Sequence, residues 1–224
     1  MNKIQIKLIL VIINREALGG FMKKKLLLIL MVCIPIISII LVILFRVTAE
    51  PTNEEIIKSL KEIKCYSTKV EYIIKNTRYE EREDTTQYYL KDIGGRIDFG
   101  EERTKIYKDN KVIVKDNISN KEYTMEQEMD IVHSLAFLNK LLSYPINENG
   151  IKEGQEEWGD TEYIEFTCEM FLDNDHLDNI RIFIDKKEKT PIGAIIYDKS
   201  GKDRIRIVYS DFEKLKQLDN GLLE

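Results

Sequence analysis

The sequence predicts an α+β protein: a large, curved antiparallel sheet with helices packed on its concave side, preceded by one transmembrane helix. Two observations predict the sheet. From residue 66 onward, apolar side chains mostly recur at every second position, in segments separated by short turns. Only two segments behind the N-terminal region keep the spacing of an amphipathic helix. A third observation, an uncharged run near the N-terminus, predicts the transmembrane helix.

The N-terminal run extends from Leu26 to Phe45, and its 20 residues carry no charge. A helix of that length spans a bilayer core of about 30 Å. Three lysines precede the run and one arginine follows it, so the positive-inside rule keeps the N-terminus in the cytoplasm and places residues 47–224 outside. We therefore expect residues 22–46 to anchor the chain in a membrane.

Two other interpretations of this segment stay open. A secretory signal peptide could be cleaved after residues 47–49 (Val-Thr-Ala), although the apolar run is longer than such signals need. A lipidation signal could use residues 30–33 (Leu-Met-Val-Cys) and attach a lipid to Cys33. Val32 stands where such signals carry a small residue, and the apolar run continues past the cysteine. A retained anchor fits the length of the run best.

Residues 1–21 are predicted to be either a short cytoplasmic segment or an upstream stretch that is not translated. Residues 18–22 (Leu-Gly-Gly-Phe-Met) could be encoded by TTA GGA GGA TTT ATG. That string places a ribosome-binding purine run directly before a start codon. We hypothesise that translation starts at Met22.

The chain behind the anchor is acidic. Residues 1–50 hold 7 of the 34 basic and 2 of the 39 acidic residues, so residues 51–224 carry a formal charge of about −10. Such a surface repels nucleic acid and anionic wall polymers. We therefore expect protein partners, apolar ligands or basic surfaces, and no binding of nucleic acid.

The first element of the folded domain is a helix. Residues 52–55 (Thr-Asn-Glu-Glu) form a capping box, and an apolar stripe follows at helical spacing to about Cys65. A charged turn is expected at residues 78–84 and a break at Gly94-Gly95. Alternation predicts strands at residues 66–75, 85–90, 96–99, 103–108, 112–116 and 122–125.

A second capping box at residues 124–127 (Thr-Met-Glu-Gln) predicts a helix that ends before Pro145. Residues 147–160 are expected to form a polar loop, and residues 213–224 a short helical or frayed tail. Four final strands are predicted at residues 164–170, 180–185, 191–197 and 205–212. The folded domain is therefore expected to cover residues 51–212.

The sequence contains none of the usual arrangements of catalytic or metal-binding residues. Cys65 and Cys168 could form a disulfide, but free core thiols are the preferred interpretation. His133 is expected to pack within the second helix. His176 is expected in a solvated turn, where neighbouring aspartates lack the pattern of a cation loop. Paired carboxylates occur in charge runs, which indicate solvated faces. We predict a protein that is not an enzyme and holds no cofactor or metal.

Several segments of the domain follow one recurring pattern. Residues 184–193 (IDKKEKTPIG) place a strand, an aspartate, a polar turn and then a proline that opens the next strand. A hairpin and a last strand follow at residues 197–202 and 207–212, and residues 94–99 and 106–112 supply a middle meander. In this pattern the domain resembles the lipoprotein-carrier fold shared by LolA, LppX and RseB proteins. The resemblance implies a half-barrel of antiparallel strands.

Within that superfamily the chain resembles the GerS-like spore-germination lipoproteins of clostridia. The likeness lies in its size, its acidic body rich in Lys, Ile and Asn, and the segment 105–125 that leads to residues 141–145 (LLSYP). The resemblance implies a non-enzymatic envelope protein of a Gram-positive anaerobe. Such a protein would bind and activate a CwlD-type amidase, a zinc-dependent enzyme that modifies cortex peptidoglycan, and would form a strand-swapped homodimer. Two alternatives stay open: a lipid- or lipoprotein-binding carrier that uses the concave face, and an RseB-like envelope sensor.

Overall fold

The computed structural model describes residues 31–41, 50–76, 78–170 and 174–223, and the chain divides into two compact units, Met1–Pro51 and Thr52–Glu224. In the first unit, residues 31–41 form a helix with exposed side chains, among them Cys33. Leu26, Phe45 and Met22, on which the predictions for the anchor and the start codon rest, lie outside the described residues. No helix in the described part of the chain is long and apolar enough to cross a membrane.

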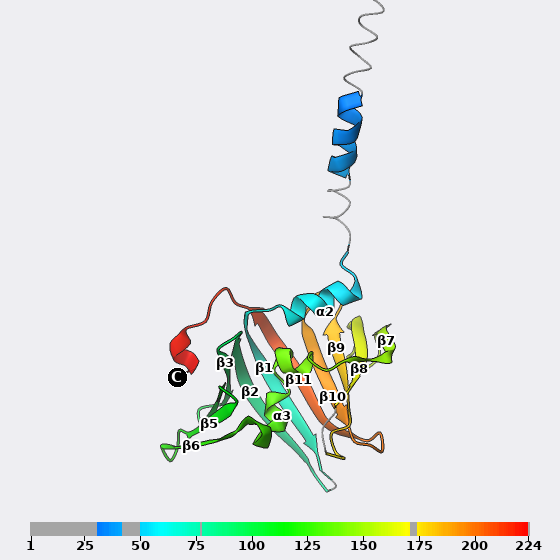
Figure 1. Cartoon of the computed structure of the whole chain (residues 1–224). Helices are drawn as coiled ribbons and strands as arrows, with labels where there is room; N and C mark the ends of the chain where they lie inside the picture. The colour runs from blue at the N-terminus through cyan, green and yellow to red at the C-terminus, as the bar shows by residue number, and fades with distance from the viewer. Residues whose placement is uncertain (1–30, 42–49, 77, 171–173, 224) are drawn as a thin grey trace, which may run out of the picture. The chain divides into compact units, whose positions relative to one another are not determined.

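The described residues of the second unit form one eleven-stranded antiparallel sheet (Figure 1). In chain order the strands are β1 (Cys65–Lys75), β2 (Glu80–Leu90), β3 (Gly94–Phe99), β4 (Arg103–Lys108), β5 (Lys111–Asp116), β6 (Lys121–Glu126), β7 (Ile146–Gly154), β8 (Tyr163–Glu169), β9 (Asn179–Asp185), β10 (Pro191–Tyr197) and β11 (Asp203–Lys214). Across the sheet their order is β6-β5-β4-β3-β2-β1-β11-β10-β9-β8-β7. The first strand therefore pairs with the last, and the sheet stays open with β6 and β7 at its edges.

Helical segments are few and short. They are α2 (Asn53–Lys61), η1 (Gln127–Met129), α3 (Ile131–Ser134), α4 (Leu138–Leu141) and η2 (Asn220–Leu223). The capping box of α2 is confirmed: the amide of Glu55 donates to Thr52 Oγ1 at 3.3 Å, and the amide of Thr52 donates to Glu55 Oε2 at 2.9 Å. The helix ends at Lys61, earlier than predicted, because Cys65 already belongs to β1.

The predicted second helix is wrong. Its expected start lies in β6, because residues 121–126 pair with β5 as an antiparallel strand. The rest is divided by Phe137, whose extended backbone (φ −69°, ψ 124°) separates α3 from α4. This break lets Phe137 pack against β3, β4 and β5, while Leu135 and Leu138 join the core over β1 and β8–β11. One continuous helix could not present these side chains to both halves of the sheet.

Tyrosine hydroxyls hold this broken segment in place. Those of Tyr72 and Tyr209 donate to the carbonyl oxygens of His133 and Ala136, at 3.1 and 2.7 Å. The hydroxyl of Tyr66 accepts from the amide of Leu138 at 3.1 Å. The bonds at Ala136 and Leu138 satisfy backbone groups in or next to the short helices, and the carbonyl of His133 accepts a second hydrogen bond, from the amide of Ala136 at 3.2 Å.

Three further predictions fail because residues expected in a loop, a turn or a break belong to strands. Residues 147–154, expected as part of a polar loop, belong to the edge strand β7. β2 begins at Glu80, inside the expected charged turn, because residues 80–84 pair with β1. Gly94 and Gly95 open β3 rather than separating two strands. The predicted bounds of the strands at 103–108 and 191–197 are confirmed.

The main core lies between the sheet and its helical cover. Apolar side chains from β1 and β8–β11 meet α2 and residues 135–142 in one cluster. Figure 1 shows α3 lying in front of the sheet, which curves around it. α2, α3 and α4 therefore pack on the concave side, as expected, whereas η2 lies against the other face of β3, where Arg96 donates to the carbonyl oxygen of Leu222. A smaller cluster of Tyr163, Phe183 and Ile195, with Trp158 against it, covers part of the other face.

Candidate functional site: an acidic notch in the sheet

The sheet is incomplete between β2 and β3. β2 pairs with β1 along its whole length, but β3 pairs only with residues 86–90 of β2. β3 ends at Phe99, and the chain turns away through Gly100, whose φ of +57° suits glycine. Residues 80–85 of β2 therefore have a strand on one side only among the described residues. We call the opening between residues 80–85 and the β3–β4 turn the notch.

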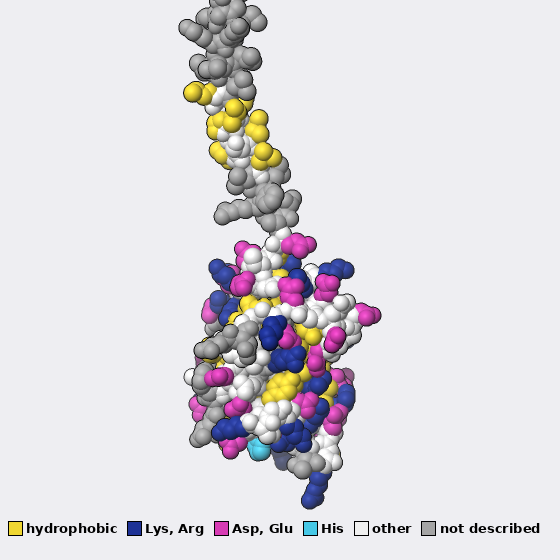
Figure 2. Space-filling model, turned by 90° about the vertical axis from the view of Figure 1, so that its right-hand side faces the viewer, with side chains coloured by type: hydrophobic (Ala, Val, Ile, Leu, Met, Phe, Trp, Pro, Cys, Tyr) yellow, Lys and Arg dark blue, Asp and Glu magenta, His cyan; other side chains and the backbone are white. Residues whose placement is uncertain are grey.

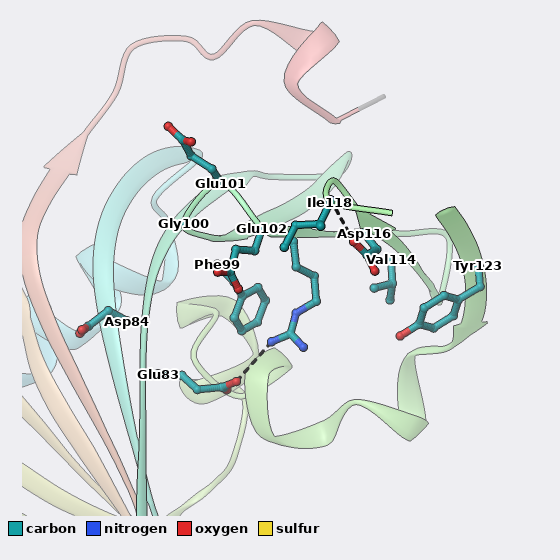
Figure 3. Close-up of a pocket in the computed structure, with 11 residues that line it drawn as sticks. Glu83, Asp84, Phe99, Gly100, Glu101, Glu102, Val114, Asp116, Ile118 and Tyr123 are labelled. Atoms are coloured by element: carbon teal, nitrogen blue, oxygen red, sulfur yellow. Dashed lines mark hydrogen bonds and ion pairs between the residues drawn. The ribbon is translucent and has the colours of Figure 1, made fainter. Parts of the chain in front are cut away.

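Cavities lie at the notch on both faces of the sheet. The larger, of about 870 Å³, is shown in Figure 3 and is lined by Glu83, Asp84, Phe99, Gly100, Glu101, Glu102, Arg103, Val114, Asp116, Ile118 and Tyr123. The other, of about 400 Å³, is lined by residues that include Lys69, Glu71 and Thr86. Asp84 and Gly100 line both cavities. Since side chains alternate between faces along a strand, Glu83 and Asp84 serve opposite faces of the notch.

Carboxylates dominate the larger cavity, which has five of them and one guanidinium, that of Arg103. Figure 3 shows Glu83, Glu102 and Asp116 around one space, whereas Asp84 and Glu101 point away from it at the rim. The guanidinium of Arg103 donates to Glu83 at 3.2 Å and lies 4.0 Å from the centre of the Phe99 ring. The cavity therefore has a net negative charge.

The carboxylates that line the larger cavity differ in whether an ion pair or a hydrogen bond offsets their negative charge. Glu83 has Arg103 and His133 as partners. Asp116 accepts hydrogen bonds from the amides of Ser119 and Ile118, which lower its pKa. Asp84, Glu101 and Glu102 form no ion pair within the described part of the chain. Their charge is available to a partner.

A buried network of charged side chains lies next to the larger cavity and shares Glu83 with it. Asp130 accepts hydrogen bonds from Lys105 Nζ at 2.8 Å and from the Tyr107 hydroxyl at 2.6 Å. His133 bridges two carboxylates: Nδ1 lies 2.8 Å from Asp130 Oδ1, and Nε2 lies 2.8 Å from Glu83 Oε2. The side chains of Lys105 and Asp130 are only 9% and 8% exposed. The network ties residues 130–133 to β2 and β4.

The pKa values of the network follow from burial and hydrogen bonding. Burial opposes the ionisation of Asp130, but hydrogen bonds from His133, Lys105 and Tyr107 outweigh it and hold its pKa below the ordinary value. Burial disfavours the charged form of His133, yet its bonds to Asp130 and Glu83 outweigh burial and raise its pKa. The bond from His133 lowers the pKa of Glu83 against the effect of burial. When it is protonated, the imidazole of His133 donates from both ring nitrogens.

The structure places the other residues considered from sequence outside this site. Cys65 and Cys168 are buried free thiols. Burial raises the pKa of Cys168 to about 11, which keeps the thiol protonated at neutral pH. His176 lies in an exposed turn, and no group of His, Cys, Asp and Glu in the described residues is placed to hold a metal ion. Cys33 is exposed on the helix of residues 31–41, and its lipidation stays a prediction.

Sequence reasoning missed the notch and the network. It treated the run at residues 80–84 as a solvated face and His133 as an ordinary helix residue. The partners of His133 lie three and 50 residues away. Only Asp130 and His133, three residues apart, were recognisable as neighbours in the sequence.

The concave face over β1 and β8–β11 is filled by the chain itself. Leu135, Leu138, Leu141 and Leu142 are buried there against the strands. An acyl chain could enter this part of the concave face only if residues 131–142 moved away.

An open, curved antiparallel sheet with a helical cover defines the fold class of this protein, and solved structures share that fold. An uncharacterized conserved protein from Thermus thermophilus shares the fold with a TM-score of 0.50 at 12% identity, over 76% of this chain and 92% of that chain. The LolA superfamily protein NE2245 from Nitrosomonas europaea gives a TM-score of 0.45 at 12% identity, over 78% and 98%. A chain in the structure of the CwlD amidase from Clostridioides difficile in complex with the GerS lipoprotein gives 0.42 at 18%, over 74% and 98%.

The chain belongs to the family of YdcC-like sporulation proteins, whose sequence profile matches residues 23–223. No curated protein matches it. The expectation from the sequence of a sporulation protein is confirmed by the family match, and the structure of the CwlD amidase in complex with GerS is among the similar structures.

Proposed function

We propose that this chain is a non-catalytic envelope protein of spore formation that binds and activates a CwlD-type amidase acting on cortex peptidoglycan. The observation that carries the proposal is the family match over residues 23–223, which makes the chain a sporulation protein. The class of partner comes from the sequence resemblance to GerS, which in Clostridioides difficile is found in complex with the CwlD amidase. A strand-swapped homodimer is part of the same proposal.

The geometry supports a binding role. An open strand edge and three uncompensated carboxylates at the notch suit contact with another protein. The buried thiol of Cys168, with its raised pKa, is unsuited to nucleophilic catalysis. The chain's own side chains fill the concave face over β1 and β8–β11, which disfavours a lipid carrier that uses that part of the sheet.

The activation test uses the full chain with an affinity tag in the sporulating source organism. We expect cross-linking and capture to recover an amidase, and the purified chain to raise the rate at which that amidase cleaves cortex peptidoglycan. An amidase whose rate does not change, or capture without any amidase, would reject the proposal. Acyl chains co-purifying in equimolar amount would support the carrier instead.

We further propose that residues 22–46 anchor the chain with its folded unit outside the cytoplasm. A Lys187→Cys variant places a thiol in an exposed turn. A membrane-impermeant maleimide should label this thiol in intact cells, whereas the buried native thiols of Cys65 and Cys168 should stay unlabelled. The unsubstituted chain is the control for any labelling at Cys33. Labelling of the introduced thiol only after cell lysis would place the folded unit in the cytoplasm.

A further inference from the structure

The notch exposes a strand edge inside the sheet rather than at its end. Six residues, 80–85, are paired with β1 on one side and with no described strand on the other. In an antiparallel strand, alternate residues point their N–H and C=O groups toward opposite neighbours. About half of the backbone groups in this stretch therefore face the notch. An edge of this kind is a template for another strand.

The space beside this edge is large enough for an added strand. Six residues of strand extend about 20 Å. The cavities of about 870 and 400 Å³ on the two faces exceed the volume of a long side chain. Because side chains alternate, an added strand would direct its side chains into both cavities in turn.

The charges at the notch specify the chemistry of the occupant. Glu102 faces the larger cavity and Asp84 the opposite face, and neither has an ion pair within the described residues. The cations that line the cavities, Arg103 and Lys69, are paired with Glu83 and Asp211. Arg82, in the edge itself, is paired with Glu71 and Glu80. We propose that the notch binds an extended, basic segment of another polypeptide, which adds as a strand to residues 80–85 and directs Lys or Arg side chains to Glu102 and Asp84.

This inference does not depend on whether the partner is an amidase, since an amidase could be activated through another surface. An apolar ligand would leave the carboxylates without partners, and a small cation would leave the backbone edge unpaired. A basic strand satisfies both.

The test measures binding of a fluorescein-labelled peptide of about eight residues in which pairs of lysines alternate with pairs of valines, so that lysines lie on both faces of the added strand. The full chain, purified in mild detergent, is titrated while fluorescence anisotropy is recorded. Two control peptides separate charge from backbone pairing: one carries glutamate in place of lysine, and one has two consecutive central amides N-methylated, which blocks both edges of the strand.

We expect the lysine peptide to bind, the N-methylated peptide to bind at least about tenfold more weakly, and the glutamate peptide to show no binding. The double variant Asp84→Lys, Glu102→Lys should weaken binding of the lysine peptide by at least about tenfold. The matched control is the double variant Glu169→Lys, Glu188→Lys. It makes the same charge change at exposed positions at the end of β8 and in the turn after β9, which β1 and β11 separate from the notch, and should alter affinity less than about twofold.

Circular dichroism verifies that both double variants keep the fold, which is expected because all four side chains are exposed. Equal binding of the methylated and unmethylated peptides would overturn strand addition. Equal losses in the two double variants would show that net charge alone attracts the peptide and would overturn the site. No binding at about 1 mM peptide would overturn the proposal as a whole.

Discussion

The two halves of the sheet are stabilised in different ways. In the half formed by β1 and β7–β11, a continuous apolar cluster joins the strands to α2 and residues 135–142. In the half formed by β2–β6, the apolar cluster is small, and charged side chains are buried beside it. Figure 2, which faces the β7 side of the unit, shows acidic and basic side chains interspersed. The notch between β2 and β3 instead carries an excess of carboxylates.

The comparison shows that one half of the sheet mainly supplies stability, whereas the other half carries the proposed binding site. Apolar burial is non-directional and fixes the shape of one half. The buried network in the other half consists of directional hydrogen bonds between charged side chains. These bonds fix the position of residues 130–133 against β2 and β4. A sheet supported in that way can leave an edge open, and the open edge is where we place the binding site.

The largest expected effect comes from breaking the network. Asp130→Ala leaves Lys105 and His133 without their shared carboxylate in a buried site, and we expect a loss of about 3–5 kcal/mol in the free energy of unfolding. Urea denaturation measures it. The double variant Lys105→Met, Asp130→Leu removes both charges and should recover much of the loss. A cost below about 1 kcal/mol for Asp130→Ala would mean that the network is not structural.

A cavity in the apolar half should cost slightly less. Ile182 is 1% exposed in β9, between β8 and β10, and Ile182→Ala should lower the free energy of unfolding by about 3 kcal/mol in the same assay. Ile118→Ala is the control in the other half. That side chain is 76% exposed, so its removal should change stability by less than about 0.5 kcal/mol. Similar losses in both variants would contradict the division drawn between the halves.

The packing of residues 131–142 onto the polar half can be tested at Gly95. A Cβ there would lie 2.3 Å from Phe137 Cε1, so Gly95→Ala should displace the ring and cost about 2 kcal/mol. Gly100→Ala meets no atom within 4 Å, but its φ of +57° should cost about 1 kcal/mol. Thermal unfolding of both variants compares a packing effect with a backbone effect. The reverse ranking would show that Phe137 does not pack on β3 as described.

The smallest effect is a pH dependence confined to the polar half. The pKa of His133 is raised in the folded state, so its contribution to stability is present below about pH 6.5 and is lost as the pH rises through the folded pKa. The lowered pKa values of Asp130 and Glu83 add stability above their ordinary values, which is lost as the pH falls. Urea unfolding at several pH values should show wild-type stability declining above about pH 6.5.

The His133→Gln variant is the control for this pH dependence. It should be flatter above about pH 6.5, because the neutral amide does not titrate. An unchanged decline in the variant would assign the titration to another group.

The sequence by itself determined the elements whose pattern is local. The capping box at Thr52 and Glu55 specifies the start of α2, because both partners lie within one turn. β4 and β10 were predicted with their bounds, since half-buried strands show their period along the chain. The fold class followed from the number and order of these segments, together with the resemblance to the LolA-like proteins.

Only the tertiary structure decided the secondary structure of segments in which strand pairing outweighs the conformational preference of the local sequence. Residues 80–84 are charged and 121–126 resemble a helix start, yet both are strands because β1 and β5 pair with them. The helix over residues 131–142 breaks at Phe137 because the two halves of the sheet lie on different sides of it. The site depends on contacts that no sequence pattern displays: His133 meets Glu83 across 50 residues, and the notch exists because β3 ends before β2 does. Local periodicity reports which face of an element is buried, whereas a site assembled across strands depends on the order in which the sheet pairs them.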